Sequence, residues 1–351
     1  MSDLDILAIR TGVAWSTEPQ VVCLRLTGDD AWNTLDRVCP ADLFVRDGQV
    51  RPSVLLDEQA RVFADVYVGS DDEGYLLFSE GPTAEHLTLH LKAHAPAGAK
   101  VAIEDMTAAH DMVSIHGPYA WELVGELLGP DLIGLPYLYF YRAEDVLCLR
   151  AGKTGEYGYD LLIPRDRTPS LLEKLEDVGR AFDLRRVGLA ALEQCSLENG
   201  FFNVRREGAR GLTPIELGVQ WRVSTRKEYV GSAALAALRK EGWARRATTV
   251  LAEHPLSAGD AVSLDGARIG EILSAGESPL VKAHVGLALI DRPFGHAGID
   301  RFVAVPAAAE GAAPVPLTTV SPPVLDNRSM YINPQRHAYA TRGRDAFPKI
   351  A

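Results

Sequence analysis

Two patterns of apolar and polar positions organise the chain up to about residue 245. Short apolar runs between turn residues are typical of strands, and longer segments with apolar residues three and four positions apart are typical of amphipathic helices. The predicted strands cover residues 21–26, 61–68, 74–78, 112–117 and 145–150, and the predicted helices cover residues 29–38, 82–94, 119–128 and 168–178. Because strands and helices alternate without regular βαβ units, the pattern favours an α+β fold over a doubly wound sheet.

The pattern changes in the last third of the chain. Apolar runs broken by Gly, Pro and Asp predict strands at residues 248–252, 261–264, 268–276 and 284–290. Several short strands at close spacing indicate a small C-terminal β-barrel or sandwich. The alanine-rich run 307–314 is predicted to be a surface loop.

Length and charge restrict the class of protein. A chain of 351 residues is long enough for two or three domains. Its formal net charge of −11 argues against binding nucleic acid or an anionic membrane, because both require a positive surface. We therefore expect neither as a partner.

The cysteines and the N-terminus indicate a cytoplasmic protein. Cys23, Cys39, Cys148 and Cys195 are widely separated and form no C-x-x-C pair, so we expect buried, reduced thiols. The first residues, M-S-D-L-D-I-L-A-I-R, lack the basic start and apolar run of a secretory signal. No apolar stretch approaches the ~18 residues that a membrane-spanning helix needs.

Asp65 is the first candidate for chemistry. In the strand R-V-F-A-D-V-Y-V, alternation places Phe63, Asp65 and Tyr67 on one face. Asp65 is then either a solvated residue on a half-exposed strand or a carboxylate in an apolar-walled cleft. In a cleft, burial would raise its pKa and suit it to proton transfer or to stabilising a developing cation.

Glu156 is the second candidate, in the glycine-rich turn R-A-G-K-T-G-E-Y-G-Y-D-L-L-I-P. Glu at a hairpin tip is usually solvated and without function. The three glycines, however, would let a ligand approach the backbone closely. A carboxylate there could accept paired hydrogen bonds from a flat heterocycle with adjacent N–H groups.

Two further clusters carry charge. His86, His90 and His94 recur every fourth residue, so a helix would align them; a metal site and a solvated histidine face are both open, and we predict no metal. Arg205, Arg206 and Arg210 gather in N-V-R-R-E-G-A-R-G-L, where guanidinium groups suit a carboxylate-rich ligand or merely solvation. The sequence contains no G-x-S-x-G, H-E-x-x-H, P-loop or G-x-G-x-x-G motif.

Taken in order, several segments between about residues 20 and 290 resemble the aminomethyltransferase family, which includes the glycine-cleavage T-protein and related tetrahydrofolate-dependent demethylases. The segments are L-R-L-T-G-D-D-A-W-N-T-L, R-V-F-A-D-V-Y-V, M-V-S-I-H-G-P-Y-A-W-E-L-V, L-P-Y-L-Y-F, R-A-G-K-T-G-E-Y-G-Y-D-L-L-I-P and T-P-I-E-L-G-V-Q-W-R-V followed by Y-V-G-S-A-A-L.

The resemblance implies a three-domain cloverleaf with a central folate channel and a C-terminal β-barrel. We expect residues 1–46 and 110–243 to form a discontinuous folate-binding domain, residues 47–109 a second domain, and residues 244–351 the barrel domain. The implied cosubstrate is tetrahydrofolate.

The resemblance also implies roles for individual residues. Asp65 would be the catalytic carboxylate beside the reactive folate nitrogen, and Glu156 would bind the pterin ring. Tyr157 and Trp221 would be aromatic walls of the channel. Arg205, Arg206 or Arg210 would meet the glutamate tail, an expectation that rests on their charge alone.

The sequence also departs from the family pattern. Glycine-cleavage members carry arginines in the helix where this chain has Leu192 and Ser196, and Ala64 replaces the first of two adjacent acids. These departures favour a demethylase that moves a methyl or methylene carbon from a small N-, S- or O-methylated substrate to tetrahydrofolate. The alternatives are a true glycine-cleavage aminomethyltransferase, which would need a lipoyl carrier protein as partner, and a non-catalytic folate-binding or regulatory protein.

Overall fold

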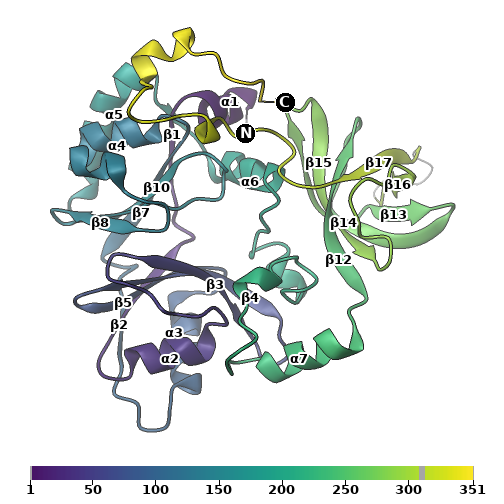
Figure 1. Ribbon diagram of the computed structural model, residues 1–351, viewed down its shortest axis with the longest axis horizontal. Helices are drawn as coiled ribbons and strands as arrows, with labels where there is room; N and C mark the ends of the chain where they lie inside the picture. Colours follow the sequence, from purple (N-terminus) through teal and green to yellow (C-terminus); the bar gives the residue numbers. More distant parts are fainter. Residues whose placement is uncertain (1, 308–312, 351) are drawn as a thin grey trace.

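The computed structural model describes residues 2–307 and 313–350. The chain forms a six-stranded sheet, a five-stranded sheet and a closed six-stranded barrel, with helices beside them (Figure 1). This α+β architecture with a C-terminal barrel confirms the predicted fold class. Most of the predicted loop 307–314 lies outside the described residues.

The six-stranded sheet has the order β11-β1-β7-β10-β9-β8. Its strands are β1 (Ala14–Thr17), β7 (His110–His116), β8 (Phe140–Ala143), β9 (Val146–Leu149), β10 (Gly158–Pro164) and β11 (Arg185–Arg186). Helices α4 (Ala120–Leu128) and α5 (Thr168–Gly179) pack their apolar sides on one face, where Trp121, Val124 and Leu175 meet Ile115 and Leu161. The opposite face carries the next residues along each strand, because side chains alternate.

The five-stranded sheet has the order β3-β4-β5-β2-β6. Its strands are β2 (Val22–Thr27), β3 (Val50–Leu56), β4 (Val62–Asp71), β5 (Gly74–Glu80) and β6 (Ala102–Asp105). Helices α2 (Ala31–Val38) and α3 (Ala84–His94) cover one face, with Leu35, Leu87 and Leu91 buried against Ala64 and Val66. The Thr83 side chain caps α3 by accepting a hydrogen bond from the His86 N–H.

The two sheets pack against each other through their remaining faces. Cys23, Leu76 and Phe78 of the five-stranded sheet meet Leu149 and Leu162 of the six-stranded sheet in one apolar cluster. Because the chain passes directly from β1 in one sheet to β2 in the other, residues 18–21 lie at the junction. The space between the sheets therefore positions polar groups from both.

The C-terminal barrel has the order β12-β15-β14-β13-β16-β17, and pairing of β12 with β17 closes it. Its strands are β12 (Arg245–Ala252), β13 (Ala261–Leu264), β14 (Ala267–Ser278), β15 (Ala283–Asp291), β16 (Phe302–Val305) and β17 (Val315–Val320). Val250, Ile272, Ala288 and Phe302 fill its interior. The first four strands match the predicted runs, and β16 and β17 complete the barrel.

The remaining segments join these three units. Helix α1 (Asp3–Thr11) packs on α6 (Leu189–Glu198), and α7 (Ser232–Glu241) precedes the barrel. Short 3-10 turns complete the described chain; they are η1 (Pro130–Gly134), η2 (Arg180–Phe182), η3 (Gly208–Arg210), η4 (Gln220–Arg222), η5 (Arg328–Met330) and η6 (Tyr339–Arg344). After the barrel the chain returns to the six-stranded sheet, where Ile332 and Tyr339 join the core under α4 (Figure 1).

Sheet membership differs from the predicted division at two places. Strand β2 and helix α2 were expected with residues 110–243, but they belong to the five-stranded sheet, because β2 pairs with β5 and β6. The segment after residue 320 was expected with the barrel, but its Ile332 and Tyr339 side chains are buried beside the six-stranded sheet. Contacts between residues far apart in the sequence decide both placements, and the composition of a segment does not reveal such contacts.

Two sequence expectations concern thiols and membranes. All four cysteines are buried and unpaired, and burial raises the pKa of each thiol. In the described ranges, none of the helices has the length and apolar character needed to cross a bilayer.

Candidate functional site

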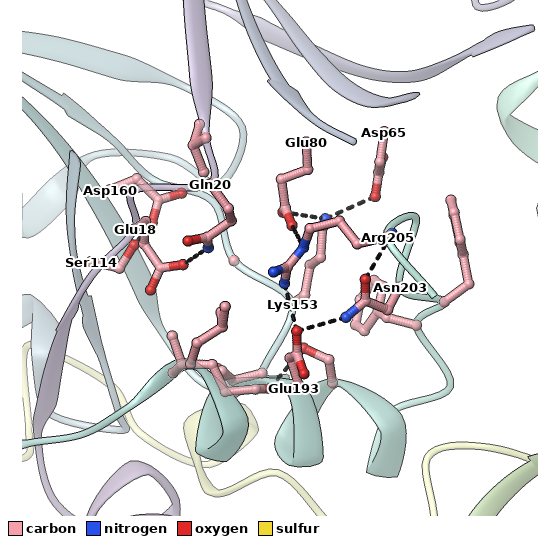
Figure 2. Close-up of a pocket in the computed structure, with 18 of the residues that line it drawn as sticks. Glu18, Gln20, Asp65, Glu80, Ser114, Lys153, Asp160, Glu193, Asn203 and Arg205 are labelled. Atoms are coloured by element: carbon pink, nitrogen blue, oxygen red, sulfur yellow. Dashed lines mark hydrogen bonds and ion pairs between the residues drawn. The ribbon is translucent and has the colours of Figure 1, made fainter. Parts of the chain in front are cut away.

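A cavity lies between the two sheets and helix α6. Counted together with the open solvent at its mouth, its empty space is about 970 Å³. Met112, Leu149, Leu192 and Phe202 are among its apolar walls. Its polar lining includes His116 and Arg206. It also includes the residues labelled in Figure 2, which are Glu18, Gln20, Asp65, Glu80, Ser114, Lys153, Asp160, Glu193, Asn203 and Arg205.

Strand alternation presents polar groups of β7 and β10 to the cavity. Val113, Ile115, Tyr159 and Leu161 face the α4 side, so Ser114, His116 and Asp160 face the cavity instead. Ser114 and Asp160 are directly paired across the two strands, and the Ser114 hydroxyl donates to the Asp160 carboxylate. A short polar column is thus built into an otherwise apolar sheet face.

Glu18 and Gln20 complete this end of the cavity from the junction between the sheets. The Gln20 amide donates to Glu18 Oε2. Burial and the nearby Asp160 charge raise the pKa of Glu18 to about 7, and burial raises the pKa of Asp160 to about 6.

Three buried polar atoms at this end have no hydrogen-bond partner among the described residues. They are Glu18 Oε1, Gln20 Oε1 and His116 Nδ1. Burial lowers the pKa of His116 to about 4, so its ring is neutral. Buried polar atoms normally find a partner, and carboxylate and amide oxygens require donors. This end of the cavity therefore fits a flat ligand edge with several N–H groups, such as a pterin.

Asp65 lies on the cavity wall formed by β4 and is only 4% exposed. Arg222 Nη1 donates to Asp65 Oδ1 at 2.7 Å, and Lys153 Nζ lies 2.8 Å from Oδ2. Burial raises the pKa of Asp65, but the charges of Lys153 and Arg222 outweigh burial, so the net pKa is lowered. Asp65 is therefore a buried carboxylate that stays ionised, not a solvated strand residue.

Lys153 joins Asp65 to Glu80 across the sheet. These two acids occupy directly opposed positions of β4 and β5, an arrangement that would be repulsive by itself. Lys153 Nζ lies 2.8 Å from each of them (Figure 2). The attraction of both acids raises the pKa of Lys153 further than burial lowers it, so it stays protonated.

Arg205 and Arg206 line the cavity, as expected for ligand-binding residues, but both already have acidic neighbours. Arg205 Nη2 contacts Glu193 of α6 at 2.5 Å, and its Nε lies 3.7 Å from Glu80. Arg206 lies 3.8 Å from Glu193. Arg210 is not among the lining residues and pairs with Glu271 of the barrel at 2.5 Å.

Glu156 is not among the residues that line the cavity. Its carboxylate accepts hydrogen bonds from the backbone N–H groups of Arg328 and Ser329, at 3.1 and 2.8 Å, and from the Ser329 hydroxyl at 2.6 Å. The expected contact with a ligand is corrected to a contact with the C-terminal segment. Gly155 also packs against protein and not against a ligand. A Cβ added at this position would lie 2.4 Å from the side-chain oxygens of Asn199 and Asn327.

Glu156 belongs to a buried cluster, here called the Arg10 cluster, comprising Arg10, Thr154, Glu156, Glu198 and Asn327. Arg10 is fully buried in α1. It donates to the Thr154 carbonyl at 2.6 Å, to Asn327 at 2.8 Å and to Glu198 at 2.5 Å, and lies 3.6 Å from Glu156. This one guanidinium holds together α1, the β9–β10 loop, α6 and the C-terminal segment.

The two predicted aromatic walls lie elsewhere as well. The Tyr157 hydroxyl donates to the Ile332 carbonyl, and its ring lies beneath Arg150. Trp221 is 68% exposed and stacks on Arg222, the partner of Asp65. Neither lines the cavity, and Tyr67 is the aromatic residue that β4 contributes beside Asp65.

The histidine column packs on an aromatic ring. A β-bulge opposite Leu55 and Leu56 interrupts the alternation of β4, and Phe63 lies against His90 of α3, with ring centroids 4.6 Å apart. This corrects the expectation that Phe63 shares a face with Asp65. Burial lowers the pKa of His90 to about 4. No three His, Cys, Asp or Glu residues in the described chain are grouped as a metal site.

Several cavity residues were not predicted from the sequence. Asp160 and His116 are polar positions on strands whose alternate residues are apolar, the same signal that drew attention to Asp65. Lys153 stands inside the glycine-rich turn, three residues before Glu156. Glu18 precedes one predicted strand and Glu80 follows another, both without a distinguishing pattern, and only the packing of the two sheets brings them to the cavity.

Comparison with known proteins agrees with this architecture. The family model described as the GCVT N-terminal domain matches residues 4–227. The chain is 25% identical over 307 residues to an aminomethyltransferase of Flavobacterium psychrophilum, covering 85% of each protein. It is 31% identical over 309 residues to an aminomethyltransferase of Frankia alni, covering 84% of this chain and 78% of the relative.

The solved structures show the same fold. The crystal structure of the glycine cleavage system aminomethyltransferase T from Bartonella henselae has a TM-score of 0.82 and 21% identity, covering 93% of this chain and 90% of that one. The matched family region contains both sheets and helix α6, and therefore every polar lining residue named above. The chain thus belongs to the aminomethyltransferase family and is a tetrahydrofolate-dependent transferase.

Proposed function

We propose that this chain transfers a one-carbon unit to tetrahydrofolate, with the pterin head bound at the Glu18 and Asp160 end of the cavity and the reactive nitrogen beside Asp65. The observation that carries the proposal is the set of unpartnered buried acceptors at Glu18 and Gln20, in the same cavity as a buried, ionised Asp65. Tetrahydrofolate supplies the nitrogen that accepts the carbon.

The residues of this chain bind, orient and stabilise charge. Glu18 and Asp160 accept hydrogen bonds from the adjacent N–H groups of the pterin edge, which fixes its orientation. Asp65, itself buried, supplies a fixed negative charge where the moving carbon becomes positive. Positioning of the two reactants contributes much of the rate, and no covalent intermediate on the protein is required.

The proposed sites of the glutamate tail are Arg205 and Arg206. Both line the cavity, and both share Glu193 as an acidic neighbour. Each arginine has five N–H donors, so a ligand carboxylate could bind the guanidinium groups beside Glu193.

Two donors are compatible with the cavity. The names of the relatives favour an aminomethyl group carried by a lipoyl arm, as in the glycine cleavage system. The alternative, a small methylated compound, is supported by the apolar wall that Leu192 gives the cavity and by Ser196 beside it, where glycine-cleavage members carry arginines. Tetrahydrofolate is the acceptor in both reactions.

A donor assay separates these two reactions. Purified protein with tetrahydrofolate is given either aminomethyl-loaded lipoyl carrier protein or a panel of methylated small molecules. Formation of 5,10-methylene-tetrahydrofolate with the carrier alone identifies the aminomethyltransferase. Formation of 5-methyl-tetrahydrofolate with a small donor identifies the demethylase. Tight folate binding without turnover on either donor set would support the third possibility, a non-catalytic folate-binding protein.

Removing the acceptors at the pterin end is expected to weaken folate binding. Asp160→Asn and Glu18→Gln each replace an acceptor by an amide that cannot pair with two N–H groups, at a cost of about 1–3 kcal/mol in binding. Isothermal calorimetry with tetrahydrofolate measures this cost. Glu156→Gln is the matched control, because Glu156 contacts the C-terminal segment; a larger loss for Glu156→Gln than for both other variants would contradict the assignment.

The same carboxyl groups predict a pH dependence. Their pKa values in the folded, folate-free protein are about 7 for Glu18 and about 6 for Asp160, above their ordinary values. The folded state therefore holds more protons than the unfolded state between about pH 4 and 7, and folate-free stability falls as pH rises through that window. Folate affinity is expected to rise over pH 6–7, because the N–H groups bind the ionised form. A flat affinity profile would count against the pair.

A further inference from the structure

Lys153 is a cation on the cavity surface beside Asp65. It extends from the β9–β10 loop of the six-stranded sheet to the five-stranded sheet, and its side chain is 17% exposed. An ammonium has three N–H donors. Asp65 Oδ2 and Glu80 Oε1, each 2.8 Å away, account for two of them in the described part of the chain. The third donor is left for a ligand in the cavity.

The position of this ammonium is fixed by the loop that carries it. The carbonyl of the next residue, Thr154, accepts hydrogen bonds from Arg10 at 2.6 Å and from Asn199 at 2.8 Å. Gly155 packs between Asn199 and Asn327. The backbone beside Lys153 is thus fixed before any ligand binds. A hydrogen-bond donor that is already in position stabilises developing charge without having to reorganise.

Transfer of the carbon creates a need for such a donor. The bond between the carbon and a heteroatom of the donor molecule breaks, and the heteroatom keeps the electron pair. The carbon bonds to the acceptor nitrogen, and the proton that this nitrogen loses ends on the heteroatom. Sulfur or oxygen leaves as an anion until that proton arrives, whereas the nitrogen of an alkylated ammonium leaves neutral.

From this geometry, and on the basis of the proposed function, we infer that Lys153 donates a hydrogen bond to the heteroatom that leaves the one-carbon unit. Asp65 stabilises positive charge on the moving carbon, and Lys153, in direct contact with Asp65, stabilises negative charge on the atom it leaves. An aminomethyl group on a lipoyl sulfur fits, because its C–S bond breaks in this way; ammonia then leaves from the same carbon as a second folate nitrogen bonds to it.

Binding of an anionic leaving-group probe tests this role without turnover. In the presence of tetrahydrofolate, 4-nitrophenol is titrated with protein, and its phenolate absorbance reports the pKa of the bound probe. Wild-type protein is expected to lower that pKa by about one unit, which corresponds to tenfold tighter binding of the anion than of the neutral phenol. Lys153→Met and Lys153→Gln are expected to abolish the shift. Identical titrations in wild type and both variants, with or without binding, overturn the inference.

A matched control and a separate folate measurement keep the result interpretable. Lys227→Met removes a lysine of nearly equal exposure, 16%, that pairs with Asp36 and does not line the cavity, so it should leave the shift intact. Calorimetry with tetrahydrofolate is run on every variant. If wild-type protein did not bind tetrahydrofolate, the proposed function would be refuted. If it binds tetrahydrofolate but shows no Lys153-dependent shift in the pKa of the probe, only the role of Lys153 is refuted.

Leaving-group acidity provides a kinetic readout. Methyl aryl ethers and thioethers with graded substituents are offered as donors, and any turnover is compared between wild type and Lys153→Gln. The variant is expected to lose most, roughly 100-fold, on the poorest leaving groups and least on the most acidic ones. An equal loss on every donor that reacts would indicate a purely structural role for Lys153 and contradict the inference.

Discussion

Asp65→Asn is expected to reduce turnover by roughly 100-fold or more while folate affinity stays within several-fold. The substitution keeps the shape of the side chain and an oxygen for Arg222, but it removes the negative charge beside the moving carbon. Single-turnover kinetics with the donor identified by the donor assay, together with calorimetry for tetrahydrofolate, measure the two effects separately. Unchanged turnover would exclude Asp65 from the chemistry.

The stability of this variant must be measured beside its activity. Asp65 is the shared counterion of Lys153 and Arg222, and removing one partner of a buried ion pair costs on the order of 3 kcal/mol. Asp36→Asn is a suitable control, because it removes the carboxylate of the more exposed Lys227–Asp36 pair, outside the cavity. If Asp36→Asn lost as much turnover as Asp65→Asn, loss of stability would explain both.

Arg10→Met is expected to produce the largest loss of stability, about 3–5 kcal/mol in the free energy of unfolding. Arg10 is fully buried, and its removal leaves Glu198 and Glu156 without their cation and the Thr154 carbonyl without its shortest hydrogen bond. Urea unfolding followed by circular dichroism measures the loss. Limited proteolysis should also cleave the segment after residue 320 sooner, because Asn327 and Glu156 hold it to the cluster.

The same helix offers a control for this prediction. Arg185 pairs with Asp5 of α1 at 2.7 Å, but its side chain is 41% exposed. Exposed ion pairs contribute about 0–1 kcal/mol, so Arg185→Met should change the unfolding free energy by less than 1 kcal/mol or so. If Arg10→Met and Arg185→Met lowered the free energy of unfolding equally, the Arg10 cluster would contribute no more to stability than an exposed ion pair.

The sequence predicted strand positions and side-chain faces correctly where a local pattern determines them. Apolar alternation identified β4 and the face of Asp65, and four of the barrel strands were located from their apolar runs and turn residues. Alternation failed at Phe63, where a bulge that depends on pairing with β3 reverses the side chain. The glycines of the β9–β10 loop were correctly recognised as positions of close approach, but what approaches them is protein.

What the sequence by itself determined is therefore the α+β class, the C-terminal barrel, the family and the choice of Asp65 as a candidate, because strand periodicity and ordered motifs are local properties. Tertiary structure alone decided that Glu156 binds the C-terminal segment and that Glu18, Lys153 and Asp160 share a cavity with Asp65. These groups come from two sheets and the chain between them. Only the packing of one sheet on the other fixes their distances, and with those distances their charges and pKa values.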